Sequence, residues 1–100
     1  MRVISVATHS ERMFDLFKQS GQKFGYTIDI VGFGEVWKGF AWRFDLILKR
    51  LLELEDSEEL VLISDAFDVV FIDYPATFIK RFKKLNSKIV FTCDPISEQW

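Results

Sequence analysis

Short and almost continuous apolar runs alternate along this chain with longer segments of helical periodicity, and no other feature of the sequence constrains the fold as strongly. The expected strands cover residues 3–7, 26–31, 60–63 and 89–92. A further apolar run, at residues 69–72, follows the third strand closely. Strands that are apolar throughout are buried on both faces, as in a parallel sheet covered by helices. We therefore predict an α/β fold, in which right-handed crossovers build a Rossmann-like, mostly parallel sheet flanked by helices.

The segments between these strands carry the periodicity and the end signals of helices. Thr8 or Ser10 is expected to cap the first helix, and Gly21 is expected to end it. The longest helix is expected at about residues 40–54, and Pro75 is a favoured first residue for the third helix. The apolar side chains that this third helix turns inward are expected to be Phe78, Ile79 and Phe82.

Composition and charge exclude several classes of protein. With 49% apolar and 28% charged residues, the chain has the core material that a disordered segment lacks. Its net charge of −2 argues against a nucleic-acid-binding protein, which normally carries a basic excess. A single cysteine, Cys93, and a single histidine, His9, exclude a disulfide framework and a metal site rich in cysteine or histidine.

We expect a single domain over residues 1–100 that does not enter a membrane. No apolar run approaches the roughly 18–20 residues that a membrane-spanning helix requires. The first strand starts directly after Met1, which leaves no room for a signal peptide. The expected location is therefore cytoplasmic, in a reducing compartment.

Polar side chains gather where the predicted strands end. Residues 8–10 (Thr-His-Ser) follow the first strand, residues 65–68 follow the strand at 60–63, and Asp94 follows the last strand. In open parallel sheets, ligands bind beyond the carboxyl ends of the strands. These polar clusters are therefore the candidate positions for ligand binding.

The acidic cluster at residues 65–68 has two interpretations. Asp65 and Asp68 flank a tight turn, so their carboxylates can converge on one hard cation such as Mg²⁺ or Mn²⁺. A cation held in this way would neutralise charge on a nucleoside-diphosphate leaving group. In the alternative interpretation, one aspartate caps the turn and the other is merely solvated, since aspartate is common in turns.

Other chemistries fit the sequence less well. The chain has no P-loop and no GxGxxG pattern, and residues 32–34 (Gly-Phe-Gly) are only a turn signal. Haloacid-dehalogenase-like phosphatases place two aspartates two residues apart, whereas Asp65 and Asp68 are three apart. Receiver domains need an acidic pair after the first strand, where this chain has residues 8–10. A catalytic triad using His9 has no nucleophile-elbow sequence to support it.

Four segments carry a resemblance that covers essentially the whole chain. The most specific are the loop Gly32-x-Gly34-Glu-x-Trp37-x-Gly39 and the turn at residues 64–69, Ser-Asp-x-aromatic-Asp-Val. With residues 4–8 and 89–91, in this order and spacing, they resemble the N-terminal glycosyltransferase domain of the procollagen lysyl hydroxylases. Similar domains occur in collagen glucosyl-galactosyltransferase-like and viral proteins. The chain corresponds to about the first half of that domain, so a truncated sheet is expected.

The resemblance implies a fold, a donor and a cofactor. The family has a GT-A fold that binds a UDP-sugar and Mn²⁺ (or Mg²⁺) and transfers a hexose, with hydroxylysine of a collagen-like protein as acceptor. By this resemblance, Asp65 and Asp68 are the metal-binding carboxylates of the family's DxxD motif. Family members are found in the ER lumen, and the sequence leaves a viral or bacterial origin open.

The resemblance also assigns donor-binding roles to four further residues. Thr8 matches a threonine that contacts the nucleotide, and Trp37 matches a loop tryptophan near the donor pocket, although an aromatic side chain there could also belong to the core. Arg43 takes the position of a donor-contacting lysine and keeps its charge. Phe67 takes the position of a tyrosine that contacts the uridine. No catalytic residue is identified.

Two readings of function follow. In the first, the chain is the nucleotide-sugar-binding half of a metal-dependent glycosyltransferase. In the second, it is a truncated, non-catalytic module that binds a nucleotide or another protein. A half-domain would leave a strand edge exposed, so self-association is an expected property.

Overall fold

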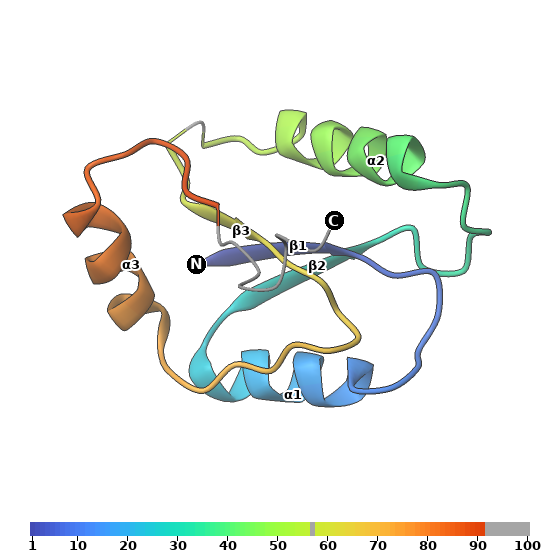
Figure 1. The fold of residues 1–100 in the computed structure, drawn as a ribbon, viewed down its shortest axis with the longest axis horizontal. Helices are drawn as coiled ribbons and strands as arrows, with labels where there is room; N and C mark the ends of the chain where they lie inside the picture. Colours follow the sequence, from blue (N-terminus) through green and yellow to red (C-terminus); the bar gives the residue numbers. More distant parts are fainter. Residues whose placement is uncertain (57, 92–100) are drawn as a thin grey trace, which may run out of the picture.

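A three-stranded parallel sheet lies at the centre of the computed structural model, which describes residues 1–56 and 58–91 (Figure 1). The elements, in chain order, are β1 (Arg2–Val6), α1 (Phe14–Phe24), β2 (Thr27–Val31), α2 (Phe40–Leu52), β3 (Val61–Ile63) and α3 (Pro75–Lys84). The strand order is β2-β1-β3, and both pairings are parallel. The predicted α/β class with a parallel, helix-flanked sheet is confirmed.

The central strand β1 supplies both faces of the core. Val3 and Ala7 join one buried cluster with residues of α1, whereas Ile4 and Val6 join a second cluster with Ile47 of α2. This division follows from the two-residue period of a strand, which turns successive side chains to opposite faces. The two helices therefore cover opposite sides of the sheet (Figure 1).

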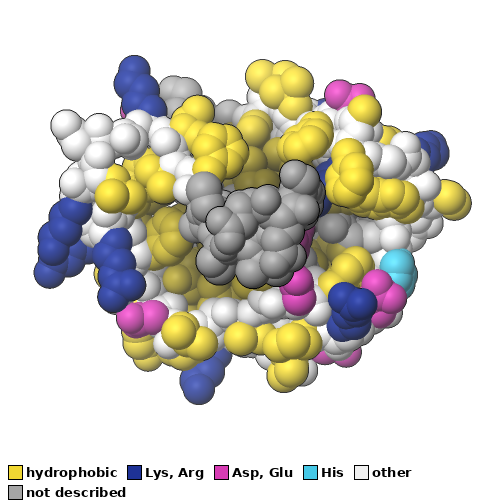
Figure 2. Space-filling model, in the orientation of Figure 1, with side chains coloured by type: hydrophobic (Ala, Val, Ile, Leu, Met, Phe, Trp, Pro, Cys, Tyr) yellow, Lys and Arg dark blue, Asp and Glu magenta, His cyan; other side chains and the backbone are white. Residues whose placement is uncertain are grey.

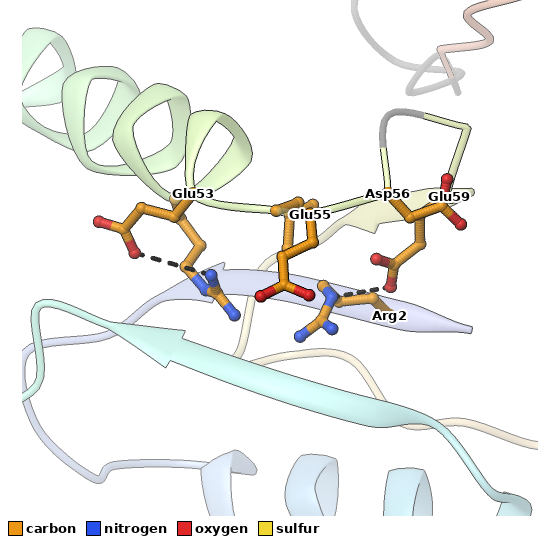
Figure 3. A pocket seen from close by; sticks show the side chains of 7 residues that line it. Arg2, Glu53, Glu55, Asp56 and Glu59 are labelled. Atoms are coloured by element: carbon orange, nitrogen blue, oxygen red, sulfur yellow. Dashed lines mark hydrogen bonds and ion pairs between the residues drawn. The ribbon is translucent and has the colours of Figure 1, made fainter.

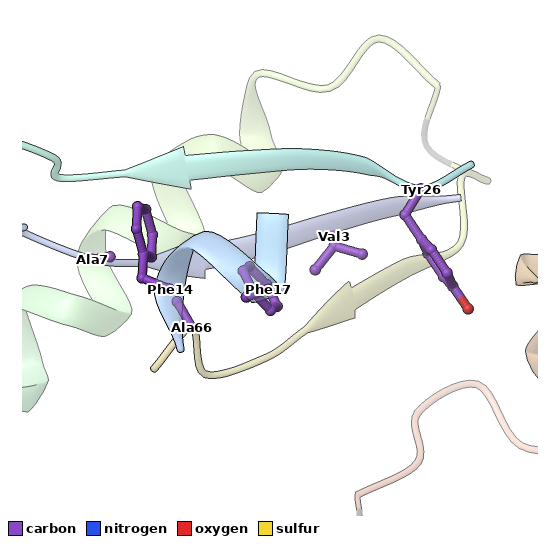
Figure 4. Close-up of a cluster of buried hydrophobic side chains, with 6 residues drawn as sticks. All are labelled: Val3, Ala7, Phe14, Phe17, Tyr26 and Ala66. Atoms are coloured by element: carbon purple, nitrogen blue, oxygen red, sulfur yellow. The ribbon is translucent and has the colours of Figure 1, made fainter. Parts of the chain in front are cut away.

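The cluster on the α1 side contains the largest buried side chains (Figure 4). Phe14 and Phe17 are 1% and 0% exposed, and Phe17 faces Phe71 with the ring centroids 5.4 Å apart. Phe71 also stacks on Tyr26 at 4.3 Å. Residues from β1, α1 and the segment after β3 therefore meet in one aromatic core.

The ends of α1 differ from the prediction. No side chain caps the helix, whose N-cap is Met13, so the capping role predicted for Thr8 or Ser10 is wrong. The Met13 N–H instead donates to the carbonyl of Phe67 at 3.1 Å, a tertiary contact that replaces a local cap. Gly21 does not end the helix either; the left-handed Gly25, with φ 87°, does so.

Gly21 is buried inside α1 because the helix approaches β2 closely there. A Cβ atom added at this position would collide with the side chain of Ile28 and lie 3.3 Å from the Phe71 ring. The glycine is thus retained for packing, at the modest helical cost that glycine carries.

The opposite side of the sheet is less completely covered. Ile47 is the buried residue of α2, and Trp42 and Leu46 pack partly against the same cluster. A row at four-residue spacing on the outer face of α2 is more than half exposed: Phe40, Phe44, Leu48 and Leu52. Figure 2 shows hydrophobic side chains standing out over this part of the molecule. Such a contiguous row is typical of surfaces that bind another protein segment.

The C-terminal third contains the main departures from the prediction. The helix α3 begins at Pro75 as predicted, but none of its residues is buried, and Phe78 is exposed rather than turned inward. Residues 69–72 and 89–91 form no strand, so the last predicted strand is wrong over its described residues. Thr92, Cys93 and Asp94 lie outside the described residues. Without a fourth strand in the described part, α3 has no sheet surface to cover.

Ion pairs join charged side chains at the amino-terminal edge of the sheet. Arg2 contacts Asp29 and Glu59, both at 2.8 Å, and Arg50 contacts the same Asp29 oxygen at 2.9 Å. The hydrogen bond to Asp29 is the main reason that the pKa of Arg2 is raised. A cavity of about 420 Å³ lies among these pairs, and Glu55 extends between the two arginines that line it (Figure 3). Both arginines of its lining are already paired, so we assign this edge to structure.

Tyr26 should make folding stability depend on alkaline pH. Burial, and then the charge of Asp73, raise the pKa of Tyr26, whose hydroxyl donates to the Asp73 carbonyl at 3.0 Å. The stability that the raised pKa of Tyr26 adds to the folded state is present in full below the pKa of tyrosine in the unfolded chain, about 10. It is lost as pH rises through the higher folded pKa, because the unfolded state releases the proton first.

Urea unfolding from pH 8 to 11 tests this expectation with matched phenylalanine variants of the two tyrosines. Tyr26→Phe should lose about 0.5–1.5 kcal/mol at pH 8 and show a shallower alkaline decline. Tyr74→Phe, at an exposed position, should keep the parent decline. An unchanged alkaline slope in Tyr26→Phe would contradict the expectation.

Candidate functional site

A crevice opens where the strand order reverses. The chain passes from β1 to β2 on one side and then to β3 on the other, so loops part at the carboxyl ends of β1 and β3. Ligands bind at such switch points in open α/β sheets. A cavity of about 240 Å³ lies there. Its lining residues are Val6, Arg12, Trp37, Arg43, Asp65, Ala66, Phe67 and Asp68.

The turn after β3 holds its two carboxylates at the surface. Ala66 is 2% exposed and anchors the turn in the core, whereas Asp65 and Asp68 on either side of it are exposed. Ser64, the residue before Asp65, is fixed as well, because its carbonyl accepts a hydrogen bond from the Ser5 hydroxyl at 2.6 Å. Contacts with the core therefore hold the turn in place, while both carboxylates remain exposed and line the cavity.

Phe67 connects this acidic turn to the segment that follows β1. Its carbonyl accepts the Met13 N–H, and its ring centroid lies 5.4 Å from that of His9 and 6.1 Å from that of Phe14. The half-buried ring forms one wall of the cavity. A planar base could pack against such a ring without any polar contact.

Arg43 reaches the cavity from the first turn of α2. Its Nη2 lies 2.8 Å from Asp65 Oδ1, in an ion pair whose arginine side chain is 23% exposed and whose aspartate is 60% exposed. The Arg43 Nε is buried and has no hydrogen-bond partner among the described residues. A buried donor without an acceptor is uncommon in proteins. The site therefore holds an unused hydrogen-bond donor next to a carboxylate.

Trp37 lines the cavity and belongs to neither buried cluster. Its side chain is 47% exposed and makes edge contacts with Phe40 and Trp42, with centroid distances of 5.8 and 5.6 Å. The loop that carries it turns at Gly34, whose φ of 87° favours glycine. The Gly34 N–H donates to the Thr8 carbonyl at 2.8 Å, which fixes the loop to the end of β1.

Thr8 is the one predicted site residue that does not line the cavity. Its hydroxyl lies 2.8 Å from His9 Nδ1, and its carbonyl is taken by Gly34. The His9 Nε2 in turn lies 3.3 Å from a Glu11 oxygen. Thr8 therefore supports the loop in the described structure, and the nucleotide contact assigned to its side chain stays a prediction.

Arg12 is a cavity residue that the sequence did not single out. It has a φ of 49°, a left-handed conformation that costs a non-glycine residue energy and that often marks functional positions. The sequence signal was a basic residue in the turn after the first strand. Its left-handed backbone conformation and its place in the cavity lining could not be predicted from that signal.

The donor set fits a divalent cation that shares its ligands with a bound molecule. Asp65 and Asp68 offer the hard oxygen ligands that Mg²⁺ and Mn²⁺ prefer. Within residues 1–56 and 58–91, no three His, Cys, Asp or Glu side chains are close enough to hold a metal by themselves. The remaining ligands would have to come from elsewhere, as when phosphate oxygens complete the coordination shell.

Comparison with known proteins decides the family. The model of a family described as the PLOD GT domain matches residues 1–97. The chain belongs to this family. The PLOD GT match spans β1 to α3 and includes every residue that lines the cavity.

Relatives of this PLOD GT chain are much longer proteins. Procollagen-lysine,2-oxoglutarate 5-dioxygenase 1 of Bos taurus is 36% identical over 101 residues, which cover 94% of this chain and 14% of the relative. Procollagen-lysine,2-oxoglutarate 5-dioxygenase 2 of Homo sapiens is 35% identical over 103 residues, with the same two coverages. The chain thus spans about 14% of the length of these relatives. In its described residues, no helix is long and apolar enough to cross a membrane.

Proposed function

We propose that this PLOD GT chain binds a UDP-sugar together with Mn²⁺ or Mg²⁺, as the donor-binding part of a hexosyltransferase. The observation that supports the proposal is the cavity at the carboxyl edge of the sheet. It is lined by two carboxylates, two arginines and two aromatic rings: Asp65, Asp68, Arg12, Arg43, Trp37 and Phe67. A nucleoside diphosphate bound with a cation presents the complementary groups.

Each pair of side chains has a distinct role in this proposal. Asp65 and Asp68 hold the cation from the turn after β3, while the two arginines face the diphosphate as fixed positive charges. Trp37 and Phe67 offer apolar surface to the base. When bound, the cation neutralises charge on the departing diphosphate. The exposed carboxylates are therefore placed to bind a cation without a burial cost.

The acceptor is proposed from the relatives alone. Their names describe enzymes that act on procollagen lysine, which suits a collagen-like acceptor. We propose hydroxylysine of such a protein as the group that receives the hexose.

Calorimetric titration of the full chain with UDP, with and without Mn²⁺, tests donor binding. The double variant Asp65→Asn/Asp68→Asn should bind UDP at least about tenfold more weakly in the presence of Mn²⁺, because it loses the charge that holds the cation. Asp45→Asn makes the same kind of charge change on an exposed residue of α2 and should leave binding unchanged. Equal UDP affinities in parent and double variant would overturn the proposal.

A second candidate function is a protein-interaction module without nucleotide chemistry. The exposed row on α2 favours it, as do the outer strands β2 and β3, each with one edge unpaired within the described residues. Self-association through these surfaces, together with no detectable binding of UDP and Mn²⁺, would favour this second function over the first.

A further inference from the structure

The Arg43–Asp65 ion pair occupies one of the two carboxylates that the proposed cation site needs. The contact is a 2.8 Å hydrogen bond from Nη2 to Oδ1, in which the guanidinium is largely buried and the carboxylate largely open to solvent. A cation approaching Asp65 therefore meets a carboxylate whose charge is already balanced. It also meets the positive charge of Arg43 at close range.

Another anion can displace Asp65 from Arg43, provided that it offers oxygens to the same guanidinium. A diphosphate is such an anion, since the planar fork of arginine donates several hydrogen bonds to phosphate oxygens.

A second observation is that one donor of Arg43, its Nε, has no acceptor among the described residues. Its Nε is buried and has no partner among the described residues, although only Nη2 is engaged by Asp65. Leaving a buried donor unpaired is costly. Arg43 lines the cavity, so its guanidinium is within reach of an anion bound there.

We propose that Arg43 is a latch that couples binding of the cation to binding of the diphosphate. This inference rests on the proposed function and adds its regulation. Without diphosphate, Arg43 neutralises Asp65 and opposes the cation. With diphosphate bound, Arg43 donates to phosphate oxygens, and Asp65 becomes free to join Asp68 in holding the cation. By thermodynamic linkage, the cation must then strengthen diphosphate binding by the same factor.

The test is a binding cycle measured on the full chain, with no turnover involved. Mn²⁺ binding is followed by electron paramagnetic resonance of free Mn²⁺, alone and with saturating UDP, pyrophosphate or uridine. In the parent chain, UDP and pyrophosphate should both tighten Mn²⁺ binding. Uridine, which lacks phosphate, should not.

The Arg43→Gln variant separates the latch from simple attraction between cation and phosphate. It should bind Mn²⁺ alone about threefold or more tightly than the parent, and its coupling factor with pyrophosphate should fall about fivefold or more. Lys49→Gln removes the same charge from an exposed position of α2 and should leave both quantities at the parent values. Circular dichroism establishes that the variants are folded.

The outcomes distinguish the two proposals. Parent-like Mn²⁺ affinity and coupling in Arg43→Gln would overturn the latch while leaving the cation site intact. A parent chain that binds neither Mn²⁺ nor UDP would overturn the proposed function and the latch together. If Arg43→Gln does not fold, Arg43→Lys replaces it. The shorter reach of the lysine should weaken the contact with Asp65 and still raise the affinity for Mn²⁺ alone, and an unchanged affinity would overturn the latch.

Discussion

Replacing Phe17 with alanine is expected to lower the free energy of unfolding by about 3–5 kcal/mol, the usual cost of truncating a buried phenylalanine. Phe17 is 0% exposed and lies against Phe71 in the cluster between α1 and the sheet. Its removal leaves a cavity that the neighbouring aromatic rings cannot fill without moving. For a domain of this size, such a loss is a large share of the whole stability.

Urea titration followed by circular dichroism measures this change. Leu16→Ala is the matched control, because Leu16 is the preceding residue of the same helix and is 53% exposed. The control should cost well under half as much as Phe17→Ala. Equal losses in the two variants would show that α1 does not pack on the sheet through Phe17.

The second large effect is expected at Gly21, where Gly21→Leu should cost about 2–3 kcal/mol through overpacking. A Cβ at this position already collides with Ile28 and lies 3.3 Å from the Phe71 ring, so a leucine requires both neighbours to move. The loss should appear even though leucine favours a helix over glycine by almost 1 kcal/mol.

A double-mutant cycle with Ile28→Ala identifies the cause. Removing most of the Ile28 side chain makes room for the new leucine, so the combined variant should be more stable than the sum of the two single losses predicts. Gln22→Leu, at the next and exposed residue, should be nearly neutral. Strict additivity in the cycle would mean that Gly21 is not held against Ile28.

The three observed strands were predictable because each is a short, mostly apolar run in the sequence. Residues 69–72 are similarly apolar but form no strand. Phe71 stacks on Tyr26, and its N–H donates to the Ser20 hydroxyl at 2.9 Å, so the segment is satisfied by a side chain instead of a neighbouring strand. Apolar composition reports that a segment packs against the core, and it does not report which groups pair with its backbone.

The grouping of the site residues was predictable in part. Asp65 and Asp68 follow a strand of a parallel sheet, and the carboxyl ends of such strands share an edge. The pairing of Arg43 with Asp65 was not predictable, because it depends on how α2 crosses the sheet. Arg12 was missed because no local residue pattern predicts its left-handed backbone or its place in the cavity lining. The binding roles of all these residues remain predictions.

The placement of β1 between its two neighbours also sets the order in which the protein can be assembled. Arg2 pairs with Thr27 across a short stretch of chain, but its other partner is Val61, and Ser5 and Ser64 are 59 residues apart in sequence. Contacts between such distant residues are the slowest to close, because more chain entropy is lost before any contact is gained. The crevice lies at the ends of β1 and β3, the two strands whose pairing is expected to form late. A newly synthesised chain should therefore form its first pair of strands before the crevice between β1 and β3 is complete.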